Sequence, residues 1–345
     1  SKIKKAQLKG TVANIQAKEV HLLTAKQTEL QADFTIKGLP NINTTVFNFN
    51  IKTLKTNAAD VEALVPQLAQ QNTFKLPSPL FEFGNILFAG SFVGLYNDFN
   101  ILGTFDTALG KINTTSKIAI KSPLRYTGNI KSPELAIGKL INNTTLAHSA
   151  IDFNFNGDGL SLADLHLQFE GSLENTKIQT YNYNKLVLNG AIENKKLVLA
   201  GSVDDPHLNV DFNSTVDWQG FNPNYVLDAK VNYAALNKLN WFTKDSVIIH
   251  GATINTNLIG SSINTIAGHL NADSVKMTTT KGDFEIARID FLAEGNEKDR
   301  TLTLQSDVID AKIIGNIDLN TIVPYFRSLA MRYAPAIAIN TKPYN

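Results

Sequence analysis

The stretch LNVDFNSTVDW, residues 208–218, alternates almost without error between apolar and polar side chains. The even-numbered positions are Leu208, Val210, Phe212, Val216 and Trp218, with Ser214 as the only polar residue among them. The odd-numbered positions are all polar. Successive side chains of a strand point to opposite faces, so the pattern predicts an antiparallel strand with one buried and one solvated face.

The same alternation recurs along most of the chain. It is seen in FNILGTFDTALG (99–110), YNYNKLVLNGAI (181–192), VLDAKVNY (226–233), TLTLQSDV (301–308) and AKIIGNIDL (311–319). Turn signals such as GLPN, NGDG and DDPH separate these segments. At the usual spacing of about 8–12 residues per strand and turn, the chain should contain about two dozen strands.

Composition and charge exclude several classes of protein. Hydrophobic residues make up 43% of the chain and charged residues 18%, which argues against disorder and against a membrane-embedded protein. The net charge is +1 and the basic residues are scattered, so no basic stripe predicts nucleic-acid binding. With no cysteine, disulfides and thiolate metal sites are excluded. We expect no cofactor and no metal.

Two segments have helical rather than strand periodicity. Residues 59–72 (ADVEALVPQLAQQN) can form a helix capped by Asp60, and Pro66 should kink this helix or shift its start. Residues 320–335 form the second amphipathic segment. Their apolar stripes are Val61, Leu64 and Leu68 in the first helix, and Ile322, Phe326, Leu329 and Tyr333 in the second. We expect both helices to lie over the apolar face of the sheet as lids.

Glycines recur near the middle of the predicted strands, as in AGSFVG (89–94), FEGSL (169–173) and LVLNGAI (186–192). They indicate either ordinary bulges or a close approach of the sheet to something else. Long runs of strands without a linker predict one continuous repetitive segment over 1–345. The predicted fold is therefore all-β: an elongated, curled antiparallel sheet, groove-like as in a solenoid, with a hydrophobic interior and two short amphipathic helices.

The order of several segments resembles the TamB family, within the wider AsmA-like group. They are AGSFVGLYNDFNILGTFDTALGKI (89–112), YTGNIKSPELAIGKLI (126–141), FNGDGLSLADL (155–165), YNYNKLVLNGAI (181–192), DDPHLNVDFNSTVDW (204–218) and LTLQSDVIDAKIIGNIDLNTIVPYF (302–326). The resemblance implies a long periplasmic protein of a two-membrane bacterium, anchored in the inner membrane by a helix outside this sequence. It also implies a curled β-taco sheet and a BamA-like or TamA-like outer-membrane barrel as partner, bound through other regions.

The resemblance assigns the apolar face a function, which is to conduct phospholipid acyl chains between the two membranes in support of outer-membrane biogenesis. The residues expected to line the groove are Phe99, Ile101, Phe105, Leu109, Leu186, Leu188, Ile192, Leu208, Val210, Phe212, Val216, Trp218, Leu227, Val231, Leu302, Leu304, Val308, Ile313 and Ile317. An even lining of aliphatic and aromatic side chains would let a lipid slide without being held at one position.

Catalytic motifs are missing, and we expect a protein that is not an enzyme. The sequence has no G-x-S-x-G, Walker or H-E-x-x-H motif. His250 and His269 could meet across strands, and Asp158 in FNGDG could bind Ca²⁺, but neither has enough partner ligands. Two alternatives stay open. One is a scaffold or chaperone for outer-membrane protein assembly and secretion; the other is a solenoid or sandwich that binds polysaccharide, hinted at by Tyr181 and Tyr183.

Overall fold

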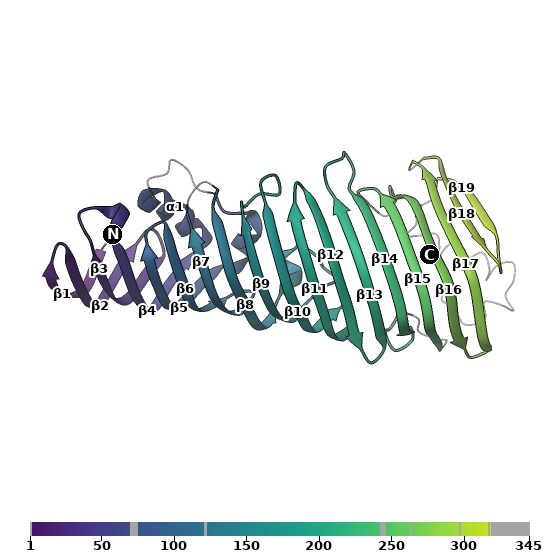
Figure 1. The fold of residues 1–345 in the computed structure, drawn as a ribbon, viewed down its shortest axis with the longest axis horizontal. Coiled ribbons are helices and arrows are strands. Elements are labelled where there is room, and N and C mark those ends of the chain that lie inside the picture. Colours follow the sequence, from purple (N-terminus) through teal and green to yellow (C-terminus); the bar gives the residue numbers. More distant parts are fainter. Residues whose placement is uncertain are drawn as a thin grey trace. The chain divides into compact units, whose positions relative to one another are not determined.

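The computed structural model describes residues 2–69, 75–120, 123–241, 246–262, 264–296, 298–316 and 318, with side chains of the first helix described only as far as residue 64. Strands hold 69% of the residues and helices 7%, which confirms the all-β prediction. The described residues contain nineteen strands, assigned to one antiparallel sheet that does not close on itself (Figure 1). Most strands are 10 to 14 residues long, which is why there are fewer than the turn spacing predicted.

Contacts divide the chain into two compact units, where the sequence predicted one continuous segment. Unit 1 comprises Ser1–Lys195 and Leu199–Pro206, and unit 2 comprises Lys196–Val198 and His207–Asn345. Unit 1 contains β1 (Lys2–Thr11), β2 (Asn14–Thr24), β3 (Thr28–Lys37), β4 (Val46–Asn57), β5 (Asn85–Leu95), β6 (Asp98–Thr107), β7 (Gly110–Ala119), β8 (Arg125–Leu135), β9 (Ser149–Asp158), β10 (His166–Ile178) and β11 (Tyr181–Glu193), with most of β12 (Lys196–Asp205). Unit 2 contains β13 (Leu208–Asp217), β14 (Asn224–Ala235), β15 (Val247–Ile259), β16 (Ala267–Thr279), β17 (Gly282–Gly295), β18 (Arg300–Ser306) and β19 (Ala311–Gly315).

Within each unit every strand pairs with the next one in sequence, antiparallel. This holds from β1 to β11 and again from β13 to β19. Directly opposed residues share a face, so Phe105 lies beside Phe88 and Ile112, and Leu188 lies beside Gly171. The face of each unit that carries these apolar residues is called the inner face, and the opposite one the outer face.

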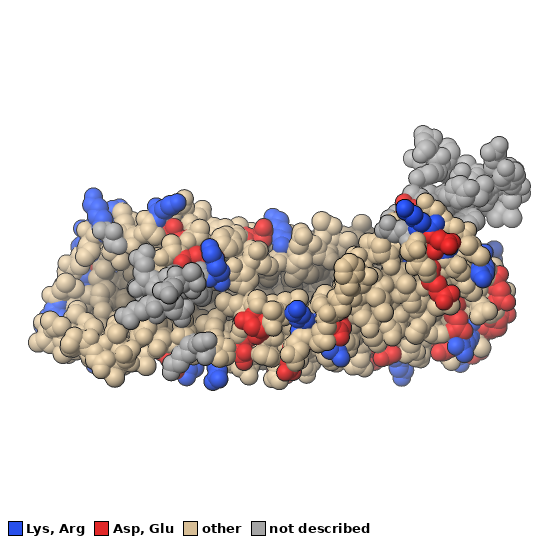
Figure 2. Space-filling model, turned by 90° about the horizontal axis from the view of Figure 1, so that it is seen from above, with Lys and Arg blue, Asp and Glu red and all other residues tan. Residues whose placement is uncertain are grey.

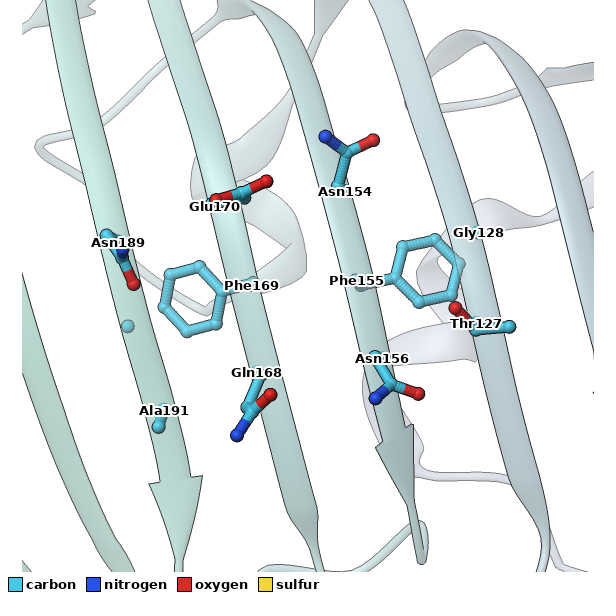
Figure 3. Close-up of a pocket in the computed structure, with 11 residues that line it drawn as sticks. Thr127, Gly128, Asn154, Phe155, Asn156, Gln168, Phe169, Glu170, Asn189 and Ala191 are labelled. Atoms are coloured by element: carbon cyan, nitrogen blue, oxygen red, sulfur yellow. The ribbon is translucent and has the colours of Figure 1, made fainter.

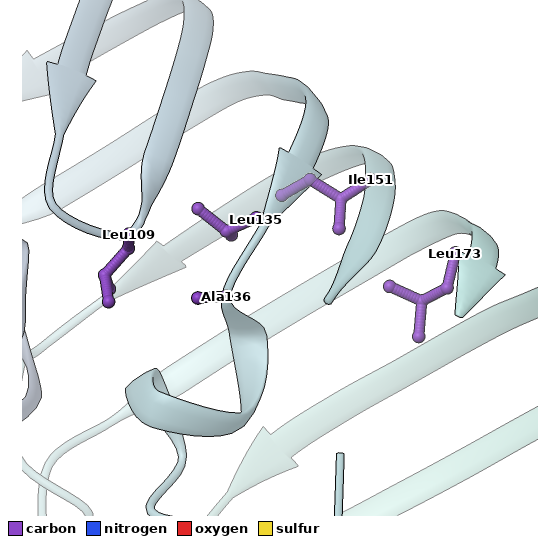
Figure 4. Packing of buried hydrophobic residues seen from close by; sticks show 5 residues of the cluster. All are labelled: Leu109, Leu135, Ala136, Ile151 and Leu173. Carbon is purple, nitrogen blue, oxygen red and sulfur yellow. The ribbon is translucent and has the colours of Figure 1, made fainter. Parts of the chain in front are cut away.

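Bulges bend several strands without breaking the inner face. The register shifts between Ala17 and Val20 of β2, and between Ser132 and Leu135 of β8. The two residues of each pair are three positions apart, so in a regular strand they would point to opposite faces. Both are nevertheless buried, because the extra residue of the bulge lets both side chains point to the same face. Strands of unit 1 consequently curve around their inner-face residues, as Figure 4 shows near Leu135 and Ile151.

The helices are short. They are η1 (Ile42–Thr44), α1 (Ala58–Ala69), η2 (Ser78–Phe83) and α2 (Ile137–Leu140). Helix α1 occupies the segment where the sequence predicted a helix over 59–72, and it continues through position 66. The capping prediction is wrong: the side chain of Asn57, not Asp60, accepts the hydrogen bond from the amide of Asp60, at 2.9 Å. The helix predicted over 320–335 lies outside the described residues.

Candidate functional site

A cluster of buried residues lies on the inner face of unit 1 (Figure 4). Its buried members are Leu109, Leu135, Ala136, Ile151 and Leu173, which are 3 to 7% exposed. Leu135, Ile151 and Leu173 come from β8, β9 and β10. Leu109 lies in the turn between β6 and β7, and Ala136 begins the segment that leads into α2. Partly buried inner-face residues surround them: Ile112, Ile130, Phe153, Leu186 and Leu188. The cluster is therefore continuous with the rest of the inner face.

Phenylalanine rings contact one another in a continuous series on the inner face of β3 to β6. The ring centroids of Phe34 and Phe49 are 4.8 Å apart, and those of Phe49 and Phe92 are 6.0 Å apart. Phe99 follows at 4.3 Å from Phe92. These separations are typical of favourable aromatic pairs, so the rings stabilise one another as well as the strands that carry them.

Strand glycines lie opposite aromatic residues in the ladders of unit 1. The directly opposed pairs are Gly94–Phe99, Gly128–Phe155, Gly157–Tyr126, Gly171–Phe153 and Gly190–Phe169. A Cβ on Gly190 would lie 3.0 Å from Cε1 of the Phe169 ring, and one on Gly171 would lie 2.8 Å from Cδ1 of the Phe153 ring. These glycines lie in regular ladders and are not bulges. The atoms that come close to them belong to the neighbouring strand of the same sheet, where an aromatic ring occupies the space of the missing side chain.

Unit 2 has an inner face that is mainly aliphatic. Val210 lies opposite Val231, and Phe212 lies opposite Ala229. Leu208, Ala229, Val231 and Ala252 are each 8% exposed. Toward its last strands, Ala293 and Leu302 are buried with Phe291 and Ile313 packed against them. Period-2 alternation thus places apolar side chains on one face of this unit as well.

Much of the inner face is only partly buried. Ile101, Phe105, Leu186, Leu188 and Phe212 all keep part of their surface accessible. Among the described residues no second sheet packs over either inner face. Exposed apolar surface is unfavourable by about 25 cal/mol per Å², so covering these side chains with apolar groups would be favourable.

Charged side chains of the strands pair on the outer face. Lys117 is 3.3 Å from Asp98, and Lys131 is 2.8 Å from Asp152. Hydrogen bonds from Asn129 and Lys131 hold the pKa of the Asp152 carboxyl below its ordinary value. These ion pairs lie on the outer face, and in the view of Figure 2 lysine and arginine are scattered over the surface rather than gathered in one stripe.

Short helices cover part of the inner face of unit 1. Phe83 of η2 and Ile137 and Leu140 of α2 pack against the buried cluster. Figure 4 shows α2 directly after Leu135 and Ala136, beside the cluster. The sequence did not predict η2 or α2, because helices of six and four residues leave almost no periodic signal.

A buried carboxylate holds the start of α1. Asp60, 4% exposed, accepts hydrogen bonds from the amide of Gln27 at 2.8 Å and from Oγ1 of Thr28 at 2.8 Å. Oγ1 of Thr28 is also 2.9 Å from Oγ1 of Thr56. Burial raises the pKa of Asp60, but hydrogen bonds from Gln27 and Thr28 outweigh it, so the pKa lies below its ordinary value.

Most of the predicted lining residues lie on the inner faces. In unit 1 these are Phe99, Ile101, Phe105, Leu109, Leu186, Leu188 and Ile192, and in unit 2 Leu208, Val210, Phe212, Val216, Leu227, Val231, Leu302, Leu304 and Ile313. Trp218 directly follows β13 and is partly buried. The sequence reasoning missed the aromatic residues Phe34, Phe49, Phe88, Phe92 and Phe153, although their own segments alternate in the same way.

Val308 was wrongly placed in the lining. It is 70% exposed and lies beyond the end of β18 at Ser306. Oγ of Ser306 accepts hydrogen bonds from the amides of Val308 and Ile309, at 3.2 and 2.9 Å, and this turn ends the strand.

Ile317 lies outside the described residues, as do Ile322, Phe326, Leu329 and Tyr333 and the side chain of Leu68. Val61 and Leu64 of α1 are partly buried.

The histidines and the Asp158 turn do not form a metal site in the described part of the chain, where no group of three candidate ligands is found. His250 bonds Oγ1 of Thr278 at 2.8 Å, while His269 lies opposite Asn257 and Leu292, so the two do not meet. Asp158 pairs with Nδ1 of His166 at 2.9 Å.

The rings of Tyr181 and Tyr183 are 4.8 Å apart, and burial together with a hydrogen bond to Asp205 raises the pKa of Tyr181.

Comparison with known proteins leaves the family unassigned. The chain matches no family model, and no curated protein or solved structure matches it significantly. None of the helices in the described residues has the length and apolar character needed to cross a membrane.

Proposed function

We propose that the inner faces hold the acyl chains of phospholipids, and that the chain is a segment of a periplasmic protein that conducts lipid between the inner and outer membranes. The observation that carries the proposal is the partly accessible apolar surface that continues from strand to strand within each unit, with the ion pairs on the other face. The sequence resemblance to TamB and AsmA-like proteins supports the same function.

The energetics favour such a role. Each CH₂ group removed from water contributes about 0.8 kcal/mol, so an acyl chain exposed in an aqueous compartment is strongly unfavourable. A lipid on the inner face would bury its chains against side chains such as Phe92, Ile101 and Leu188 and leave its headgroup in water. Because similar apolar residues follow on each strand, neighbouring positions offer similar binding energy, and the lipid can move between them. No catalysis is required.

Further parts of the proposal come from the resemblance. They are an inner-membrane anchor outside this sequence and a BamA-like or TamA-like barrel in the outer membrane as partner. Helices η2 and α2 would then regulate access to the inner face of unit 1, since Phe83, Ile137 and Leu140 already occupy part of it.

Neighbouring residues on opposite faces provide a test with a matched control. Ile101 lies on the inner face beside Phe92 and Ser116, while Leu102 is 57% exposed on the outer face. In the full-length protein, Ile101→Asp should block phospholipid transport, because a carboxylate is costly to bury among acyl chains. Leu102→Asp introduces the same charge one residue away and should leave transport unchanged.

Transport is measured as transfer of labelled phospholipid between the two membranes, with protein abundance and melting temperature checked for both variants. Equal transport by the two variants at equal abundance would contradict the proposal. An Ile101→Asp protein that does not fold would be replaced by Ile101→Asn, for which the same comparison holds.

A further inference from the structure

The outer face of unit 1 carries a depression of about 640 Å³ across β8 to β11 (Figure 3). Two rows of side chains border it. One row is Asn154, Glu170 and Asn189, and the other is Thr127, Asn156, Gln168 and Ala191. The register puts members of a row on adjacent strands, with Asn156 opposite Gln168 and Asn154 opposite Glu170. Between the rows lies the backbone of Gly128, Phe155, Phe169 and Gly190. The two phenylalanine side chains point to the inner face, and the glycines are paired directly with them.

The chemistry of the depression is that of a hydrogen-bonding site. Asn156, Gln168 and Asn189 each offer amide donors and a carbonyl acceptor, and Glu170 offers two acceptors. No hydrogen bond or ion pair occupies the side chains of Asn156, Gln168, Asn189 or Glu170 within the described part of the chain. Among the residues that line the depression, only Ala191 presents an apolar side chain on the outer face, and none is a lysine or arginine. Lipid tails and phosphate groups are thus poor ligands for it.

A second depression, of about 440 Å³, shares Asn156, Gln168 and Ala191 with the first. Its further charged or titratable lining residues are Asp158, His166, Glu193 and Arg125, and Arg125 makes no ion pair with any described residue. The carboxylate of Asp158, opposite Arg125 in the ladder, bonds His166 instead. A free guanidinium beside a row of amides can take a carboxylate in a bidentate geometry.

We propose that these two depressions bind a linear glycan whose sugars carry hydroxyl groups and a carboxylate. Sugar hydroxyls both donate and accept, as the amides do. Adjacent strands are about 4.8 Å apart, close to the length of one sugar unit, so a glycan that runs across the strands meets an amide of the same row at each sugar. The carboxylate pairs with Arg125. This site is on the opposite face from the proposed lipid surface and does not depend on it.

The test uses two soluble probes: the tetramer of N-acetylglucosamine, which is neutral, and tetragalacturonate, which is acidic. Titration of the purified protein, followed by calorimetry at low salt, should show binding of both, with tetragalacturonate the tighter. Asn156→Ala and Gln168→Ala should each weaken both probes about fivefold, the effect of one lost hydrogen bond. Arg125→Gln should remove only the advantage of the acidic probe.

Asn213→Ala provides the matched control, because Asn213 is an exposed amide on the outer face of β13 and lines neither depression. It should bind both probes like the parent. All four residues to be changed are at the surface, and melting temperatures verify that the variants fold. The proposal is overturned if neither probe binds at millimolar concentration. It is also overturned if Asn156→Ala and Gln168→Ala bind like the parent, or if tetragalacturonate binds no more tightly than the neutral probe, which would exclude the pairing of its carboxylate with Arg125.

Discussion

At the scale of single residues, the inner face of unit 1 depends on glycines that let a neighbouring strand or ring come close. Gly171 is the clearest case. A Cβ there would meet the carbonyl oxygen of Asp152, and it would lie 2.7 Å from Cα of Phe153. Neither backbone atom can move without disturbing the ladder between β9 and β10. Gly251 in β15 differs, because nothing lies within 4 Å of the position of its Cβ.

Gly171→Ala should therefore lower the free energy of unfolding by about 1–3 kcal/mol, the usual cost of overpacking. Gly251→Ala is the control, and it should be neutral or slightly stabilising because alanine restricts the unfolded chain more than glycine does. Urea denaturation of both variants measures the difference. Equal stability of the two would show that close approach at Gly171 is not what requires glycine.

Residue by residue, the sequence predicted the faces of the strands well and their interruptions poorly. The side chains of Phe99, Leu188 and Val210 were placed correctly because strand parity is a local property of the chain. The bulge at Glu19, whose φ is +52°, depends on another strand: its amide donates to Oδ1 of Asp33 at 2.7 Å. The end of β18 depends on the Ser306 hydroxyl. Such contacts form only after the strands have paired.

At the scale of elements, the carboxylate of Asp60 attaches the start of α1 to the sheet. The carboxylate joins the turn between β2 and β3, at Gln27 and Thr28, to the first turn of the helix. Because the pKa of Asp60 is lower in the folded protein, its contribution to stability is complete above its ordinary value of 3.8 and is lost as the pH falls below it.

Asp60→Asn should consequently reduce the free energy of unfolding by about 1–2 kcal/mol at pH 7, because charge-assisted hydrogen bonds are lost. The difference from the parent should shrink as the pH is lowered through 3.8 and below. Hydrogen exchange should show the loss concentrated in 58–64. Asp106→Asn, at an exposed position of β6, is the control and should not change the stability at either pH. A deficit of Asp60→Asn that stays constant with pH would contradict the role of the charge.

At the scale of the whole molecule, the sequence predicts an elongated protein, and this stays a prediction. A compact globule of this length has a radius of gyration of about 20 Å. Small-angle scattering of the purified protein should give a clearly larger value, because strands that each pair with the next one in sequence spread their residues in one direction. A value near that of the compact globule would contradict the prediction.

The central claim, that the inner face contacts lipid, is tested most directly by photo-crosslinking at two adjacent residues of β11. Leu188 lies on the inner face beside Gly171, while Val187 is 42% exposed on the outer face. A photoreactive amino acid is introduced at either position in the full-length protein in cells, and crosslinked phospholipid is detected by mass spectrometry. The account predicts lipid adducts at position 188 and not at 187. Adducts at neither position, or equally at both, would contradict it.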